Sequence, residues 1–427
     1  MNRIIYKGFA VAFVALTLTA CAGRKTYERP NVVNEKLFRT DNIPTDSLSS
    51  ANVSWRNIFT DATLQGHINK ALSNNLDVRV AMQNVASAQA YLKQSKAAFI
   101  PTLAAQANYT RATSSINAMG GVGERTYNNL WDLTGSASWE ADIWGKLSAQ
   151  KRASYASYLA TVEVQKAVQS EVVATLATAY YQLLMLDKQK KVLEQTIDFR
   201  QKSLETTKHL KEAGSTTEVA TKQIEALVYN AQAQLISIKN SVWALENTIC
   251  VLLGEEPHTI ERTTLAEQNF PTEFKQGYAA KLLQNRPDVA RAELSLRNAF
   301  EMTNVARAAF YPTLTLSARG GFSSTELDTW ISAKSIFANF VAGLAQPILN
   351  GRQIRTQYEV RQIEQETALL NFKKVILSAG KEVADAMQNF SNQTEFIELK
   401  NKEMKAYQEA TDYSKQLFDS GMVNYLE

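Results

Sequence analysis

The chain contains little cysteine, histidine or proline for its length. Only two cysteines, three histidines and eight prolines occur among its 427 residues. Two cysteines exclude a disulfide framework, and the histidines at positions 67, 209 and 258 have no metal-binding spacing. The glycine-rich stretch near residue 120 is not followed by a phosphate-binding lysine. The sequence therefore carries no signature of catalysis, and no cofactor is expected.

Long hydrophobic runs and an excess of one charge are also missing. Outside residues 8–18, no apolar stretch is long enough to cross a bilayer as a helix. The 46 basic and 42 acidic residues leave a net charge of +4 and form no basic stripe with interleaved aromatic residues. The sequence thus gives little support to nucleic-acid binding.

The N-terminus is typical of an exported lipoprotein. Arg3 and Lys7 precede the apolar run 8–18, which is the length of a secretion signal rather than of a membrane span. The run ends Leu-Thr-Ala-Cys, the pattern of a bacterial lipobox, so we expect acylation of Cys21. The alternative is an ordinary signal peptide followed by an incidental cysteine.

The chain is internally duplicated. Residues 74–103 and 285–314 align without a gap at a constant spacing (288 − 77 = 211), and both copies end Ala-Ala-Phe-x-Pro-Thr-Leu. Because proline stops a helix and the residues after it alternate between apolar and polar, each copy is expected to be a long helix followed by a strand.

A second strand is predicted in each half. Trp131 and Trp139 lie on the apolar side of the first of these, eight residues apart, which at about 3.3 Å per residue matches the distance between two aromatic girdles of a membrane strand. Asp132 and Glu140 alternate with them, and Arg319 takes a polar position in the second half. We expect these three charges to face a water-filled lumen, although each is also compatible with a simple surface position. A soluble β-hairpin remains the alternative.

The segment from about Leu147 to about Lys211 contains neither proline nor glycine. As one helix it would be about 95 Å long, which favours coiled-coil or tubular packing. Gly214 then predicts a turn into a second helix, and Gly421 repeats the signal (421 − 214 = 207). The expected fold class is thus α+β, with a long helical barrel and membrane strands.

Four membrane strands cannot close a barrel, because the smallest outer-membrane barrels have about eight and an open edge cannot face lipid. Closure must come from other subunits.

Several motifs resemble one known family. They are Trp55-Arg-Asn-Ile-Phe-Thr-Asp61, Ser138-Trp-Glu-Ala-Asp-Ile-Trp-Gly-Lys146, Leu252-Leu-Gly-Glu-Glu-Pro257, Leu282-Leu-Gln-Asn-Arg-Pro-Asp-Val-Ala-Arg-Ala-Glu293, Ala308-Ala-Phe-Tyr-Pro-Thr-Leu314 and Gln346-Pro-Ile-Leu-Asn-Gly351. In these the chain resembles the lipoprotein outer-membrane factors of RND-type tripartite efflux systems, the TolC/OprM/NodT family.

The resemblance implies a homotrimer in which four strands per protomer build a shared transmembrane β-barrel in the outer membrane. It implies a passive exit duct for small toxic solutes, docked to a periplasmic adaptor and an inner-membrane RND transporter. It also implies an aperture at the periplasmic helix ends, with Leu426 at the family's apolar constriction position. The repeat places Val219 and Gln223 in the equivalent region of the first half. The family's aperture aspartate and arginine would follow Glu427, so the sequence is expected to be incomplete.

Two other functions remain open: a type I protein-secretion conduit, and a non-channel coiled-coil envelope lipoprotein. Type I conduits usually lack the lipobox, and a scaffold would not need alternating strands. The transported substrate is not readable from the sequence.

The prediction divides the chain into nine segments. They are a signal peptide (1–20), a lipid-anchored segment (21–56), a first-repeat helix (57–101), first-repeat membrane strands and outer loop (102–144), a first periplasmic hairpin (145–255), a linker (256–272), a second-repeat helix (273–312), second-repeat membrane strands and outer loop (313–349) and a truncated second hairpin (350–427).

Overall fold

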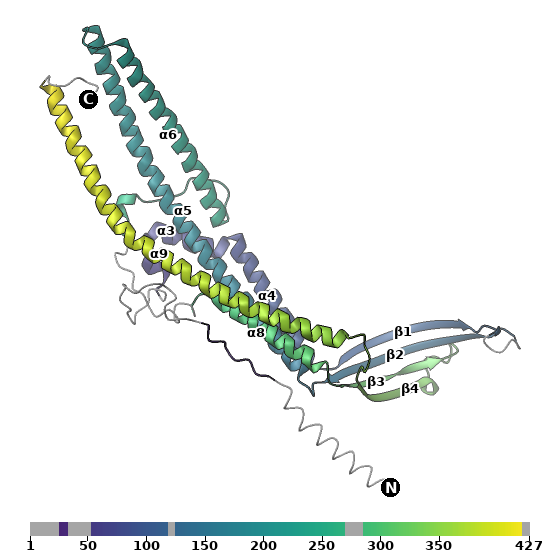
Figure 1. Cartoon of the computed structure of the whole chain (residues 1–427). Helices are drawn as coiled ribbons and strands as arrows, with labels where there is room; N and C mark the ends of the chain where they lie inside the picture. Colours follow the sequence, from purple (N-terminus) through teal and green to yellow (C-terminus); the bar gives the residue numbers. More distant parts are fainter. Residues whose placement is uncertain (1–24, 33–52, 118–123, 270–284, 421–427) are drawn as a thin grey trace. The chain divides into compact units, whose positions relative to one another are not determined.

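A computed structural model describes residues 25–32, 53–117, 124–269 and 285–420 (Figure 1). The elements in chain order are α2 (Trp55–Ile58), α3 (Ala62–Asn74), α4 (Leu76–Ala97), β1 (Thr102–Thr113), β2 (Tyr127–Ala141), α5 (Lys146–Glu212), α6 (Glu218–Leu253), η3 (Leu265–Glu267), α8 (Pro287–Ala308), β3 (Thr313–Ser324), η4 (Ala333–Ser335), β4 (Ile336–Ala345) and α9 (Gln353–Asp419). No helix in these ranges is both long enough and apolar enough to cross a membrane.

The duplication is confirmed by the element boundaries. Helices α4 and α8 both have 22 residues, strands β1 and β3 both have 12, and helices α5 and α9 both have 67. The first two pairs are offset by 211 positions (287 − 76 and 313 − 102), and the third by 207 (353 − 146). The difference of four residues arises between the first strand and the long helix of each half, where β2 has 15 residues and β4 has 10.

The expected single helix over residues 57–101 is wrong. Two helices, α3 and α4, meet at Asn75, which caps the end of α3 and the start of α4. Its backbone N–H donates to the Ala71 carbonyl at the end of α3, and its Oδ1 accepts from the N–H groups of Asp77 and Val78 at 2.9 and 3.1 Å. Asparagine favours such a capping position, because its side chain replaces the missing backbone partners of the first turn.

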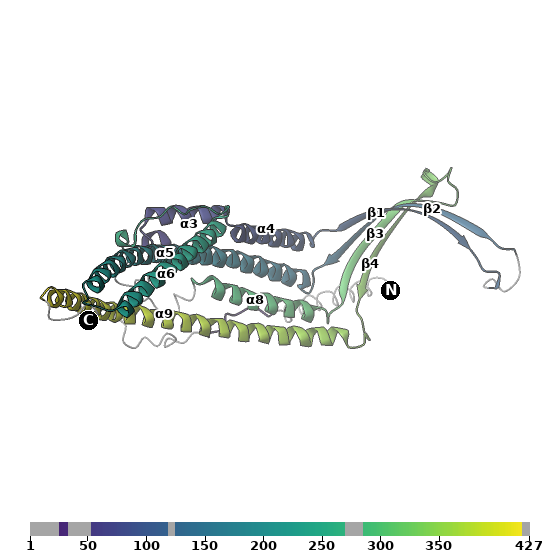
Figure 2. The ribbon, with the colours of Figure 1, turned by 90° about the horizontal axis from the view of Figure 1, so that it is seen from above.

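The long helices are bounded by caps that the sequence encodes. At the start of α5, the Asp142 carboxylate accepts from the N–H groups of Leu147 and Ser148, after Gly145 with φ +73°. The helix ends within one residue of the expected position, at the turn around Gly214, whose φ of +75° only glycine adopts without a penalty. Figure 2 shows α5 and α6 leaving this turn side by side.

The chain forms two compact units. The first comprises the described parts of Met1–Asn31, Asn84–Val162 and Arg291–Lys373, and the second those of Val32–Gln83, Glu163–Ala290 and Lys374–Glu427. The first unit contains the β-sheet. Next to the sheet, α8 is bonded to α5 through Asn298, which donates to the Ala153 carbonyl at 2.8 Å, and to α9 through Thr303, which donates to the Arg361 carbonyl at 3.0 Å.

The hydrophobic core of the second unit lies where α3, the middle of α5, the end of α6 and the following linker meet. Its most buried large side chains include Tyr180, Leu183 and Leu184 of α5. Cys250 of α6 is also buried, and its sulfur contacts the His258 backbone at 3.3 Å. Met185, next to this cluster in the sequence, is half exposed.

The sheet is an antiparallel meander in the order β1-β2-β3-β4. Gly321 of β3 lies directly against the backbone of β2. A Cβ atom there would lie 1.9 Å from the carbonyl oxygen of Leu133, so no side chain fits at this position. The less distinct strand predicted around Phe340 is confirmed as β4, which ends directly before Gln346.

Candidate functional site

The register of the sheet sorts the candidate residues onto two faces. Cross-strand partners point to the same side, and β2 and β3 pair Asp132 with Ser323 and Ser136 with Arg319. Since even-numbered residues of β2 share one face, Asp132, Glu140 and Arg319 lie together on it. Trp131 and Trp139 lie on the other face. One side of the sheet is therefore polar and charged, and the other is apolar.

The two tryptophans mark the ends of the apolar face. Trp131 packs against Tyr109 with ring centroids 4.2 Å apart and against Trp330 at 5.7 Å. Eight residues away, the Nε1 of Trp139 donates to the Phe99 carbonyl at 2.9 Å, at the end of the sheet from which the helices leave. The separation of about 26 Å along the strand fits the roughly 25 Å apolar band of outer-membrane barrels.

The charges on the polar face have different surroundings. Lys146 donates to Glu140 at 3.0 Å, so this carboxylate is paired at the entrance of α5. The guanidinium carbon of Arg319 lies 5.8 Å from the centre of the Phe337 ring. Asp132 stands opposite Ser323 in the register. The face thus presents two acids and one base above a floor of small polar residues, a surface suited to contact with water.

Both edges of the sheet are open among the described residues. β1 pairs only with β2, and β4 pairs only with β3. Each edge carries a row of unpaired backbone groups, which hydrocarbon cannot satisfy. The sheet is therefore incomplete as a membrane structure in one chain.

The helical hairpin carries the second group of candidates. Thr217 caps α6 by accepting from the Ala220 N–H at 3.2 Å, and Lys211 forms an ion pair with Glu218 across the turn. Val219, 66% exposed, and Gln223 lie on the first turn and a half of α6, next to Gly214. Cys21, Gly421 and Leu426 lie outside the described residues.

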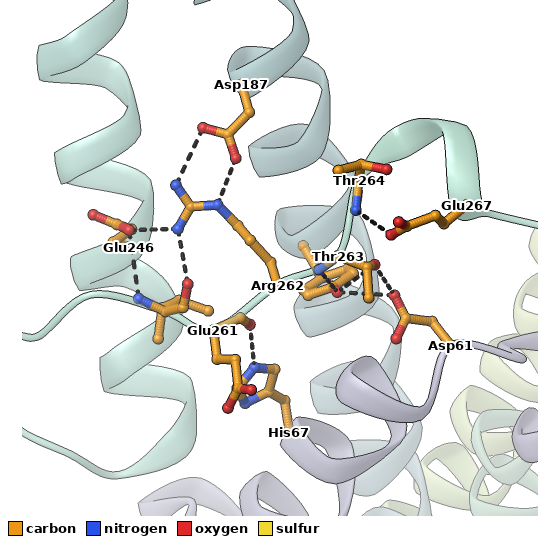
Figure 3. Close-up of polar contacts among 11 residues, drawn as sticks. Asp61, His67, Asp187, Glu246, Glu261, Arg262, Thr263, Thr264 and Glu267 are labelled. Atoms are coloured by element: carbon orange, nitrogen blue, oxygen red, sulfur yellow. Dashed lines mark hydrogen bonds and ion pairs between the residues drawn. The ribbon is translucent and has the colours of Figure 1, made fainter.

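A polar cluster in the second unit, which we call the clasp, was missed by the sequence reasoning (Figure 3). Its first half is Asp61, the N-cap of α3, whose carboxylate accepts from Tyr180 of α5 at 2.8 Å and from Thr263 of the linker after α6 at 2.5 Å. Gln268 donates to the same oxygen at 2.9 Å. Burial opposes the ionisation of Asp61, but the hydrogen bonds from Thr263, Gln268 and Tyr180 outweigh it and lower its pKa to about 2.

The second half of the clasp is Arg262, also on the linker. Its guanidinium donates to both oxygens of Asp187 on α5, at 2.5 and 3.1 Å, and to Glu246 on α6 at 2.5 Å. Burial tends to lower the pKa of Arg262, but the hydrogen bonds that the guanidinium donates to Asp187 and Glu246 raise it overall. Figure 3 shows the guanidinium between the two helices. The clasp joins residues up to 207 positions apart, so no local pattern could have indicated it.

These features together define an outer-membrane channel component built from long helices and a small two-faced sheet. The family model "Outer membrane efflux protein" matches residues 67–255 and 279–427, and the chain belongs to this family. The resemblance inferred from the motifs is confirmed.

Individual relatives agree with this assignment. The chain is 27% identical over 425 residues to "Cation efflux system protein CusC" of Escherichia coli (strain K12), covering 97% of this chain and 90% of that protein. It is 26% identical over 405 residues to "Probable outer membrane lipoprotein SilC" of Salmonella typhimurium, covering 94% and 86%. A crystal structure of CusC has the same fold, with a TM-score of 0.84 and 24% identity over 94% of this chain and 90% of that one.

The protein is accordingly an outer-membrane efflux channel, and its relatives are channel proteins rather than enzymes. As a member of this family, it acts in efflux at the outer membrane.

Proposed function

We propose that three copies of this chain form one duct, in which three sheets of four strands close a barrel of twelve. The observation that carries the proposal is the sheet itself, which has one apolar face, one polar face and two unpaired edges. Pairing β1 of one protomer with β4 of the next satisfies every edge group and leaves none exposed to lipid. A closed ring also places the apolar faces outside and the polar faces inside.

The polar face then lines the lumen. Asp132, Glu140 and Arg319 would form charged rings that keep the duct filled with water and influence which solutes pass. Because Glu140 is paired with Lys146, the three Glu140 side chains around the lumen would carry little net charge. Asp132 and Arg319 would then contribute more to the electrostatic potential in the lumen.

The duct would be gated at the helical hairpins. The exposed Val219 and Gln223 would border the periplasmic aperture, together with Gly421 and Leu426, which lie outside the described residues. The periplasmic adaptor, which docks together with an RND-type transporter, would pull the inner hairpin near Gly421 outward and so widen the aperture. Small toxic solutes would then pass passively to the exterior, and Cys21 would tether each chain by its lipid.

The test is the native mass of the protein, produced from its full natural reading frame and extracted from outer membranes in detergent. We expect a trimer with one lipid modification on each chain and, in planar bilayers, a conductance. The Cys21→Ser variant, which lacks the thiol that would be acylated, serves as the control for the lipid modification. A lipidated monomer without conductance would contradict barrel closure and favour a coiled-coil scaffold.

A further inference from the structure

The apolar face of the sheet contains a depression with a volume of about 680 Å³. Twelve residues line it. Eight belong to two neighbouring rows of this face: Leu103, Ala137, Ala318 and Phe340, and Ala105, Gly135, Gly320 and Ala338. The other four, Ala104, Ser136, Arg319 and Asn339, form the row between them, whose side chains belong to the polar face by the alternation of the strands. Six of the eight positions on the apolar face are alanine or glycine, and the two large side chains stand at the edges of the sheet. The floor is therefore low across all four strands.

Large side chains border the depression along the strands. On one side the next row of the same face contains Leu133, Phe322 and Ile336, and on the other side it contains Trp139 and Leu316. No side chain on the two rows of the floor carries a polar atom. An occupant that lies over these two rows therefore contacts hydrocarbon side chains, which favours an apolar occupant over water.

The position of the depression points to one leaflet of the membrane. Ala137 is two residues from Trp139, a distance of about 7 Å along the strand, whereas Trp131 is six residues away. Trp139 lies at the end of the sheet from which the helices leave, which is the periplasmic end. The depression therefore lies at the depth of the periplasmic leaflet, where an acyl chain of a lipid in that leaflet can occupy it.

A cation lies at the same end. The Nζ of Lys151 is 5.3 Å from the centre of the Phe99 ring, and the carbonyl of Phe99 accepts the hydrogen bond from Trp139. Lys151 is exposed, and none of the ion pairs among the described residues involves it. A tryptophan with a lysine at the apolar boundary is the usual arrangement around a lipid headgroup.

We propose that this depression binds one acyl chain of a periplasmic-leaflet phospholipid whose phosphate is held by Lys151. The inference rests on the proposed function, because it requires the apolar face to lie on the outside of the closed barrel. The bound chain fills the low floor between the bordering rows, where an uneven surface would otherwise lose contacts with the bilayer. Each protomer would then carry one ordered lipid, distinct from its covalent anchor.

Native mass spectrometry of the delipidated complex with added phosphatidylglycerol tests the proposal. We expect one tightly bound phosphatidylglycerol per chain. Ala318→Leu, which fills the floor, and Lys151→Met, which removes the cation, should each weaken this binding about tenfold or more. Ala342→Leu adds the same side chain to the same face outside the depression and should leave binding unchanged.

Other outcomes overturn the proposal in distinguishable ways. Equal lipid retention by all variants, with the trimer intact, would show ordinary annular lipid only. Displacement of phosphatidylglycerol by lipid A at equal concentration would assign the depression to the outer leaflet and remove the role of Lys151. If the unmodified protein gave no trimer in the same spectra, the proposed barrel itself would fail. Should Ala318→Leu not assemble, undiminished binding by Lys151→Met would still refute the headgroup site.

Discussion

Replacing Arg262 by methionine should release the linker after α6 from the hairpin α5–α6. The arginine makes two hydrogen bonds to Asp187, one to Glu246 and one to the Ile260 carbonyl at 2.8 Å. Methionine has a similar length but donates none of them. The variant therefore leaves two carboxylates without their cation, and Glu246 has a side chain only 9% exposed.

The cost follows from the burial of the two acids. Removing one partner of a buried ion pair costs about 3–5 kcal/mol. Asp187, with 36% of its side chain exposed, regains water, so the lower end applies, about 3 kcal/mol. At about 1.4 kcal/mol per factor of ten, the opening equilibrium of the linker should shift by roughly 150-fold.

Hydrogen–deuterium exchange of the detergent-purified protein measures this directly. Amides of residues 258–268 should lose about two orders of magnitude of protection in Arg262→Met. Arg262→Lys should recover only part of it, because an ammonium cannot donate in bidentate fashion to Asp187 while reaching Glu246. The control is Lys202→Met, which breaks a largely exposed pair with Asp198 on the same helix α5 and should have almost no effect. A loss of protection below threefold in Arg262→Met would refute the reasoning.

Three further predictions concern other parts of the chain. Gly321→Ala should impair assembly, because the new Cβ would lie 1.9 Å from a backbone oxygen of the neighbouring strand. The control is Gly343→Ala, whose Cβ would meet no atom nearer than 3.7 Å, so this variant should assemble normally. The yield of heat-resistant oligomer on gels distinguishes the two variants. Arg152→Met should lower the free energy of unfolding by about 3 kcal/mol, because it leaves the carboxylate of Glu301, whose side chain is 5% exposed, without its cation. The double variant Arg152→Met, Glu301→Met should recover much of this loss, and denaturant titrations of both variants measure the difference. Asp61 has a pKa of about 2 in the folded protein against the usual 3.8, so the stability that its ionised form contributes to the fold is present above about pH 4 and is lost as the pH falls towards 2. Asp61→Asn should therefore flatten the pH dependence of amide protection in the linker over that interval. An unchanged pH dependence would contradict the role assigned to Asp61.

The order of elements could be predicted because its signals are local and repeated. The ends of α5 and the strand after each Pro-Thr-Leu depend on glycine, proline and periodicity, which act within a few residues. The break at Asn75 was missed, because the capping side chain sits inside an otherwise continuous helical pattern and needs the fold to decide between two conformations. In the second half, Pro287 at the first position of α8 gives the clearer signal.

The sequence by itself determined the duplication, the extent of the long helix α5 and the alternation that puts Asp132 and Trp131 on opposite faces of the sheet. Tertiary structure alone decided which distant side chains meet. Tyr180 contributes its buried ring to the core and its hydroxyl to the clasp, and no sequence pattern distinguishes Arg262 from the other arginines of the chain. The reason is physical: periodicity is fixed by backbone geometry within one element, whereas a hydrogen bond between residues 61 and 263 exists only after packing has brought separate elements together.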